Sequence, residues 1–215
     1  MLKLYTYFRS SASYRVRIAL NLKGLAYEAL PVHLVRDGGQ QHTSAFTALN
    51  PSALVPVLQD GELTLRQSLA IIEYLEERHP EPALLPPDLP GRARVRALAQ
   101  DVACEIHPLD NLRVLRYLEQ PLGVDAESRN TWYRHWVDTG FAAIERGLRE
   151  SPHTGRFCHG DTPTLADCCL VPQVFNAERF KVSMSLYPTI ARITEHCQSL
   201  EAFRRAAPAA QPDAE

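Results

Sequence analysis

The sequence lacks an excess of either charge, because its 23 lysines and arginines face 25 acidic residues and leave a net charge of −2. Such a balance argues against a nucleic-acid-binding surface that spreads over the whole chain. No apolar run approaches the roughly 18–20 residues that span a bilayer, and residues 1–5 (MLKLY) do not resemble the start of a signal peptide, so we expect neither a membrane span nor a secretory leader. The composition, 45 % apolar and 22 % charged, is typical of a globular protein.

The five cysteines lack the spacing of a disulfide framework or of a metal site. Their number is odd, no C-x-x-C pair occurs, and Cys168 and Cys169 are neighbours, which is a poor geometry for an ordinary disulfide. Cysteines and histidines do not pair at the spacing that zinc ligands need. We therefore expect no metal, and reduced cysteines that pack as small apolar residues in a cytoplasmic protein.

Residues 1–80 alternate between strand-like and helix-like patterns. Residues 2–8 are apolar and aromatic with a period near two, which predicts a strand, and residues 11–23 carry apolar side chains at helical spacing up to Gly24. The further elements that we expect are strands at residues 25–34, 55–58 and 63–66 and helices at residues 44–49 and from Ser68. This order predicts an α/β domain.

The rest of the chain follows a proline-rich stretch. Five prolines between residues 80 and 90 predict an extended linker over residues 81–90, because proline interrupts helices. Residues 91–207 have apolar side chains at helical spacing, few glycines and no alternation typical of strands, so we expect an all-helical domain of about five helices. Residues 208–215 are expected to form a flexible tail.

The junction between the first strand and the first helix, residues 8–15 (FRSSASYR), is the most informative place for chemistry. Backbone N–H groups and the positive end of the helix dipole stabilise an anion at such a junction, a thiolate included, and a hydroxyl from Ser10 or Ser11 can lower the pKa of that anion. Plain helix capping by serine explains the same residues equally well. A serine hydrolase is disfavoured, because no acid or histidine lies nearby in the sequence and G-x-S-x-G is absent.

Two more corners of the first domain suit a peptide-like or anionic ligand. Val55-Pro56 lies inside an apolar run, where a cis peptide would let the Val55 backbone pair with an extended ligand. A proline on an edge strand is the alternative. Gln67-Ser68 offers a second helix N-terminus with two polar side chains, or simply another cap.

From residue 5 to residue 212 the chain resembles the zeta class of the glutathione transferase superfamily. The motifs that carry the resemblance are residues 9–20 (RSSASYRVRIAL), 37–41 (DGGQQ), 48–51 (ALNP), 55–56 (VP), 67–75 (QSLAIIEYL), 160–161 (GD), 164–167 (TLAD) and 176–180 (NAERF). The first is similar to the specific zeta signature, whereas the general superfamily motifs say little about the substrate. The resemblance implies a thioredoxin-like α/β N-terminal domain that binds glutathione, an all-α C-terminal domain that binds the substrate, and a homodimer.

The resemblance also implies site residues by position. Ser10 and Ser11 match the serines at the sulfur of glutathione, which makes them the expected catalytic residues. The positions that match glutathione contacts are Ser10, Ser11, Gln41, Val55, Gln67, Ser68, His107, Asn111, Leu112 and Arg113. Arg9, Arg113 and Arg179 are expected to bind the carboxylates of the substrate, since guanidinium groups pair with carboxylates, although a surface charge is the alternative for any arginine.

The activity that the resemblance implies is glutathione-dependent cis–trans isomerisation, with maleylacetoacetate converted to fumarylacetoacetate in the breakdown of tyrosine and other aromatic amino acids. The family usually has cysteine after the two serines, and Ala12 stands there in this chain, which leaves the sulfur chemistry to glutathione itself. The alternatives are maleylpyruvate as the substrate, conjugation of glutathione to small electrophiles such as haloacids, and a binding domain without turnover. The intact loop at residues 37–41 favours maleylacetoacetate. We expect neither nucleic acid nor membrane as a partner.

Overall fold

The computed structural model describes all 215 residues, and the chain divides into two compact units. The first unit contains Met1–Leu84 together with Gln198–Glu215, and the second contains Leu85–Cys197. The sequence predicts a boundary over residues 81–90 and a single helical domain over residues 91–207. The structure differs at the end of the chain, because the residues after Cys197 belong to the first unit.

The first unit is built on a four-stranded sheet with the strand order β2-β1-β3-β4. Its strands are β1 (Leu2–Thr6), β2 (Tyr27–Pro31), β3 (Val57–Asp60) and β4 (Leu63–Arg66). β1 runs parallel to β2 and antiparallel to β3, and β3 pairs antiparallel with β4. Leu4 and Leu58 are partners in the central pair of strands, and both are fully buried.

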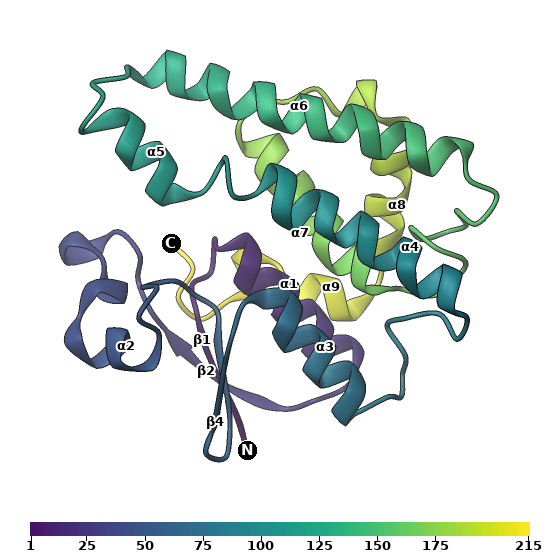
Figure 1. Ribbon diagram of the computed structural model, residues 1–215, viewed down its shortest axis with the longest axis horizontal. Helices are drawn as coiled ribbons and strands as arrows, with labels where there is room; N and C mark the ends of the chain where they lie inside the picture. The colour runs from purple at the N-terminus through teal and green to yellow at the C-terminus, as the bar shows by residue number, and fades with distance from the viewer. The chain divides into compact units, whose positions relative to one another are not determined.

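Helices flank this sheet. α1 (Ser11–Leu22) and α3 (Ser68–Arg78) pack against each other, and the short α2 (Ser44–Leu49) lies on the other side of the strands (Figure 1). Two 3₁₀ turns, η1 (Arg36–Gly38) and η2 (Gln40–His42), connect β2 to α2. The expected thioredoxin-like α/β domain is confirmed, and its elements follow the predicted order.

The buried guanidinium of Arg17 explains why the end of the chain belongs to the first unit. Arg17 is 0 % exposed, and it donates to the Thr6 hydroxyl and to the carbonyl of Ala206 in α9 (Glu201–Ala206), each at 3.0 Å. Asn21 of α1 donates to the carbonyl of Ala202 at 2.9 Å. Arg17 and Ala206 lie 189 positions apart, so hydrophobic periodicity cannot predict that they meet.

The end of the chain also differs from the expected flexible tail. Pro208–Ala210 form the 3₁₀ turn η5, and the Gln211 side chain donates to the carbonyl of Ala207 at 2.9 Å. The carboxylate of Asp213 accepts a hydrogen bond from the backbone N–H of Phe8 at 3.0 Å. The Asp213 contact depends on a residue at the other end of the sequence, which composition does not reveal.

The second unit is helical. Its elements are α4 (Leu89–Gln100), the wider π-helical turn η3 (Asp101–Ile106), α5 (Leu112–Glu119), α6 (Ala126–Glu150), α7 (Leu165–Arg179), the 3₁₀ turn η4 (Met184–Leu186) and α8 (Pro188–Ser199), whose last residues pass into the first unit. α7 is central, since Cys168, Cys169 and Val171 are fully buried on it and α4 packs against it. The expected all-α domain is confirmed. Not one helix of the chain is both long and apolar enough to cross a membrane.

The linker is shorter than the predicted one over residues 81–90, because α4 already begins at Leu89. Pro90 lies in the first turn of this helix, where its missing N–H has no helical partner to lose. Asp88 caps the helix by accepting a hydrogen bond from the Gly91 N–H at 2.8 Å. Proline interrupts a helix when it lies in the interior, whereas the first turn tolerates it.

A buried ion pair joins the end of α1 to α3. Lys23 Nζ lies 2.7 Å from Glu76 Oε2, and the Lys23 side chain is 0 % exposed. Nζ also donates to the carbonyls of His79 and Pro82, and Glu76 accepts from the Leu84 N–H. We expect Glu76→Ala to lower the free energy of unfolding by about 3–5 kcal/mol, because it leaves a buried ammonium without its carboxylate. Urea denaturation measures this.

The double variant Lys23→Met/Glu76→Leu is the control for this prediction. It removes both charges and fills the space with apolar atoms, so it is expected to be more stable than Glu76→Ala. If Glu76→Ala and the double variant lost the same stability, the unpaired ammonium of Lys23 would not be the cause of the loss.

Candidate active site

Ser10 lies between β1 and α1 and caps the helix. Its Oγ accepts a hydrogen bond from the Ser13 N–H at 3.2 Å, and its own N–H donates to the Tyr7 carbonyl at 3.0 Å. The cap does not use the hydroxyl proton, so this proton can be donated to an anion in front of the helix. The first turn of α1 contains no acidic residue, and the helix dipole favours an anion there. Ser11 begins the helix and is buried.

The loop before Ser10 is held by a buried cation that sequence reasoning missed. The terminal nitrogens of Arg17 donate to the carbonyls of Tyr7 and Phe8 at 3.3 and 2.9 Å. Burial lowers the pKa of Arg17 to about 10, so the guanidinium remains charged at neutral pH. A signal that could have revealed it is the alternation of arginine with apolar residues over residues 15–20 (RVRIAL), in a helix that is buried almost all round.

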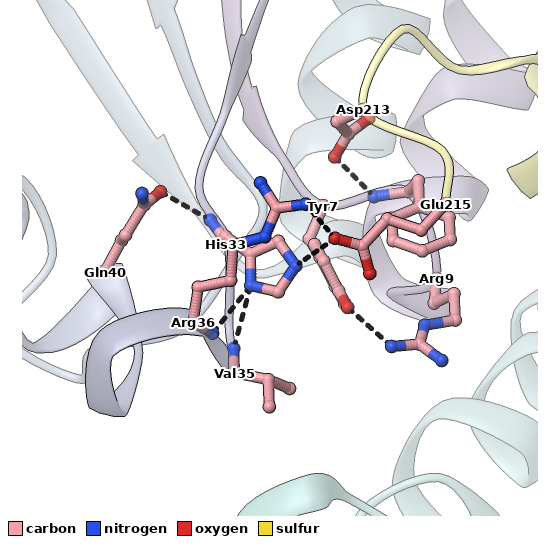
Figure 2. Close-up of polar contacts among 9 residues, drawn as sticks. Tyr7, Arg9, His33, Val35, Arg36, Gln40, Asp213 and Glu215 are labelled. Carbon is pink, nitrogen blue, oxygen red and sulfur yellow. Dashed lines mark hydrogen bonds and ion pairs between the residues drawn. The ribbon is translucent and has the colours of Figure 1, made fainter.

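Arg9 directly precedes Ser10. Its Nη2 donates to the Tyr7 hydroxyl at 2.9 Å (Figure 2). Its guanidinium lies 5.0 Å from the centre of the Phe8 ring. These contacts orient the side chain, and a guanidinium has further N–H donors for a carboxylate. One of the three arginines expected to bind substrate is therefore next to Ser10.

The start of α3 is a second helix N-terminus without an acidic residue in its first turn. Gln67 precedes the helix with φ +70°, which is uncommon for a residue other than glycine, and its side chain makes no capping hydrogen bond. Backbone strain of this kind costs roughly 1–3 kcal/mol and is typical of ligand-binding sites. Arg15 of α1 donates to the Ser68 hydroxyl at 3.2 Å and brings a positive charge to this helix end. An anion at Gln67 and Ser68 is therefore stabilised.

Val55 lies beside the loop that leads to Ser10. The peptide bond between Val55 and Pro56 is cis, and β3 begins only at Val57, so the peptide groups of Val55 lie before the start of the β1–β3 ladder. The Val55 side chain packs in a buried cluster with Tyr7 and Phe8. The structure therefore brings Val55 and this loop together.

Gln41 is buried in the segment between β2 and α2. Its Nε2 donates to the Leu34 carbonyl at 3.3 Å, whereas its buried Oε1 has no hydrogen-bond partner. Gly39 has φ +106°, a backbone conformation that favours glycine, and a Cβ on it would lie 2.5 Å from Gln41 Nε2 and displace that side chain. An orphaned buried acceptor costs roughly 1–3 kcal/mol. Oε1 is suited to accept an N–H from a bound ligand.

The expected site residues of the second unit occupy three positions. Asn111 caps α5 by accepting from the Arg113 N–H at 3.0 Å, so Asn111, Leu112 and Arg113 lie together at the start of this helix. His107 follows η3, and π-helical turns are frequent at functional sites. Arg179 ends α7 and is exposed, as is Arg113.

Asp110 is a buried carboxyl that sequence reasoning missed. It is 6 % exposed, and neither of its carboxyl oxygens has a hydrogen-bond partner. Burial raises the pKa of Asp110 to about 8, so the group is largely protonated at neutral pH. Nothing in the polar stretch of residues 107–111 distinguishes this aspartate from an exposed one.

Both units match models of one protein family. The glutathione S-transferase N-terminal domain matches residues 4–83, and the glutathione S-transferase C-terminal domain matches residues 130–196. A probable maleylacetoacetate isomerase of Vibrio cholerae serotype O1 is 56 % identical over 211 residues, which are 98 % of this chain and 97 % of the relative. A solved structure of maleyl pyruvate isomerase, described as a bacterial glutathione S-transferase in the zeta class, is 54 % identical with a TM-score of 0.96 over 99 % of this chain and 100 % of that one.

The chain belongs to the zeta class of the glutathione S-transferases. A second solved structure is similar to it over 99 % of both chains, with a TM-score of 0.95 and 44 % identity. That structure is a maleylacetoacetate isomerase from Methylobacterium extorquens AM1 with bound malonate and GSH.

The first unit of this zeta-class glutathione transferase offers groups that fit glutathione, a peptide with two carboxylates and a thiol. The N-termini of α1 and α3 suit its anionic groups. The peptide groups of Val55 suit its backbone, as in other extended peptides that pair with a strand edge, and the orphaned Oε1 of Gln41 suits one of its N–H groups. The residues present therefore fit the cofactor.

Proposed function

We propose that this zeta-class glutathione transferase is a glutathione-dependent cis–trans isomerase that converts maleylacetoacetate to fumarylacetoacetate. The observation that carries the proposal is the Ser10 hydroxyl, whose proton is not used by the cap, at a helix N-terminus without a first-turn acid. Such a place stabilises a thiolate. The names of two relatives agree with this reaction, and one of them binds GSH together with malonate, a small dicarboxylate.

The first unit holds glutathione and activates its sulfur. When bound, glutathione supplies a thiolate that adds reversibly to the electron-poor cis double bond, which lets this bond rotate before the thiolate leaves. Ser10 donates its hydroxyl hydrogen bond to the sulfur and, with Ser11 at the start of α1, keeps the sulfur ionised at neutral pH. Gln67 and Ser68 bind a carboxylate at the start of α3, and Val55 pairs with the peptide backbone.

The remaining contacts bind the tripeptide and the substrate. Gln41 accepts an N–H through its orphaned oxygen, and His107, Asn111, Leu112 and Arg113 complete the set of glutathione contacts. Arginine binds carboxylates through paired N–H donors, so Arg9, Arg113 and Arg179 hold the carboxylates of the substrate. The same cations would also stabilise negative charge on an oxygen of the substrate.

An isomerase assay with purified protein tests the proposal. The substrates are maleylacetone, a stable stand-in for maleylacetoacetate, and maleylpyruvate, each with and without glutathione. Maleylpyruvate is the second candidate because a relative that is 54 % identical is named for it. Turnover that requires glutathione without consuming it is expected, with maleylacetone the faster substrate. A stable glutathione adduct would instead support conjugation, and binding of glutathione by calorimetry without turnover of either substrate would support a binding domain.

We expect Arg113→Ala and Arg179→Ala each to lower kcat/KM for the isomerisation about 10- to 100-fold. Each variant loses a charge-assisted hydrogen bond worth roughly 1.5–3 kcal/mol, and about 1.4 kcal/mol corresponds to a factor of ten. Replacement by lysine is expected to restore part of the activity, because lysine keeps the charge without the paired donors. Arg146→Ala is the matched control, since Arg146 is exposed on α6 and pairs with Glu150. If both alanine variants match the parent, the arginines do not bind the substrate.

We also propose a homodimer in the cytoplasm that acts in the breakdown of tyrosine and other aromatic amino acids. The support for all three is the zeta-class resemblance; in addition, the five cysteines form no disulfide and four of them are buried, as in a reducing compartment. Sedimentation velocity tests the dimer. Accumulation of maleylacetoacetate or its decarboxylated form in cells that lack the gene tests the pathway.

A further inference from the structure

A pocket of about 350 Å³ lies in the first unit at the end of β2. It is lined by Pro31, His33, Arg36, Gln40 and residues 212–215. None of these residues belongs to the proposed glutathione or substrate contacts. The side chain of Glu215 reaches into this region and lies against His33 and Arg36 (Figure 2).

The tautomer of the neutral His33 ring is fixed by the backbone around it. Its Nδ1 accepts hydrogen bonds from the N–H groups of Val35 and Arg36, at 3.2 and 2.8 Å. Nδ1 therefore carries no proton, and the neutral ring carries its proton on Nε2. His33 is 8 % exposed, so this Nε2–H is a buried donor with a fixed direction.

Glu215 is a carboxylate in contact with both donors of the pocket. Its Oε1 lies 3.3 Å from His33 Nε2 and is paired with the guanidinium of Arg36. The approach to Nε2 is too poorly aligned for a hydrogen bond, and Nε2 has no other partner. The Nε2–H of His33 is therefore a buried donor without a hydrogen bond, and it lies beside the guanidinium of Arg36. A small free carboxylate that can align with both donors suits this site better than the tethered side chain of Glu215.

Glu215 can leave the pocket without disturbing the residues around it. Asp213 is held by the Phe8 N–H at 3.0 Å, independently of Glu215. His33 is held by Gln40, whose Oε1 accepts from the His33 N–H and whose N–H donates to the His33 carbonyl, each at 2.8 Å. The side chains of Glu215 and Arg36 are 40 % and 64 % exposed, so water can compete for their ion pair.

We propose that His33 and Arg36 form a binding site for small carboxylate anions, which Glu215 fills in the resting chain and from which a free carboxylate displaces it. The site does not depend on the proposed isomerisation. It is separated from Arg9 by Tyr7, whose ring packs edge-on against His33 at 5.0 Å and whose hydroxyl accepts from Arg9. A carboxylate bound there thus lies one aromatic side chain away from a proposed substrate contact.

Titration with acetate, followed by nuclear magnetic resonance of isotope-labelled histidine side chains, tests the site without glutathione or turnover. The His33 signal is assigned from its loss in His33→Gln. Acetate is expected to shift the Nε2 signal of His33, with an apparent Kd about three- to sixfold lower in Glu215→Gln than in the parent, because an exposed ion pair is weak and fills the site only in part. Acetamide, the neutral analogue, is expected to cause no shift.

Two arginine variants complete the experiment. Glu215→Gln/Arg36→Gln is expected to lose the acetate response, whereas Glu215→Gln/Arg78→Gln keeps it, because Arg78 is an exposed arginine of α3 outside the pocket. Retention of the response in the Arg36 variant would overturn the proposal. So would equal acetate affinities of parent and Glu215→Gln, or a His33 signal that acetate does not move in either protein. The complete histidine and amide spectra show whether each variant is folded.

Discussion

Replacing Ser10 with alanine is expected to lower kcat/KM of the isomerisation about 100- to 1000-fold, the usual effect of removing one hydrogen bond to a reacting anion. The hydroxyl proton of Ser10 is free for the sulfur because its cap uses only the oxygen, which accepts from the Ser13 N–H. Without the hydroxyl, the pKa of the bound glutathione thiol rises, and less thiolate is present at neutral pH. The ultraviolet absorbance of the thiolate, followed against pH in the complex, measures this directly.

Loss of the helix cap must be separated from loss of the sulfur contact. Removing an N-cap costs about 0.5–2 kcal/mol of stability, so Ser10→Ala alone changes two properties. Ser10→Thr keeps both the cap and the hydroxyl and is expected to retain most of the activity. Asp125→Ala removes the cap of α6, where Asp125 accepts from the Ser128 N–H at 2.9 Å, and is expected to lower stability without changing the thiol pKa. If the pKa of the bound thiol is the same in Ser10→Ala as in the parent, Ser10 acts only as a helix cap.

Most helices and strands of the first unit were predictable because they follow from local patterns. Apolar positions at helical spacing after a serine gave the helix at residues 11–23, which is observed as Ser11–Leu22. The helix at residues 44–49 and the strand at residues 63–66 agree with α2 and β4. The second strand is shorter than expected, Tyr27–Pro31 instead of residues 25–34, since strand ends depend on the neighbouring strand.

The features that escaped prediction depend on contacts between distant residues. Arg17 joins α1 to Ala206, and Asp213 accepts from Phe8, so the end of the chain is ordered by partners that no local pattern identifies. The same limit applies to the candidate site. The position of Ser10 and Ser11 at the start of a helix could be predicted from the sequence. The orphaned oxygen of Gln41 and the burial of Asp110 are properties of the packed structure.

Asp110→Asn is expected to remove one large contribution to the dependence of stability on pH. Burial raises the pKa of Asp110 to about 8, well above the ordinary value near 4 that applies in the unfolded chain. Between these values the folded protein binds more protons than the unfolded one, so the free energy of unfolding falls as pH rises, by at most about 1.4 kcal/mol per pH unit from this group. Asparagine carries no charge at any pH and has no such slope.

The two proteins are therefore expected to exchange their order of stability. Near pH 5 the protonated Asp110 and the asparagine that replaces it are both neutral, so Asp110→Asn is as stable as the parent or slightly less stable. Near pH 8 the Asp110→Asn variant is more stable than the parent by about 2–4 kcal/mol. Urea denaturation at several pH values between these limits measures the difference. Asp37→Asn, which removes an exposed carboxyl in η1, is the control for net charge and is expected to run parallel to the parent. Parallel curves for Asp110→Asn and the parent would mean that the Asp110 carboxylate finds water or a cation in the folded protein, because such a partner offsets the burial that raises its pKa.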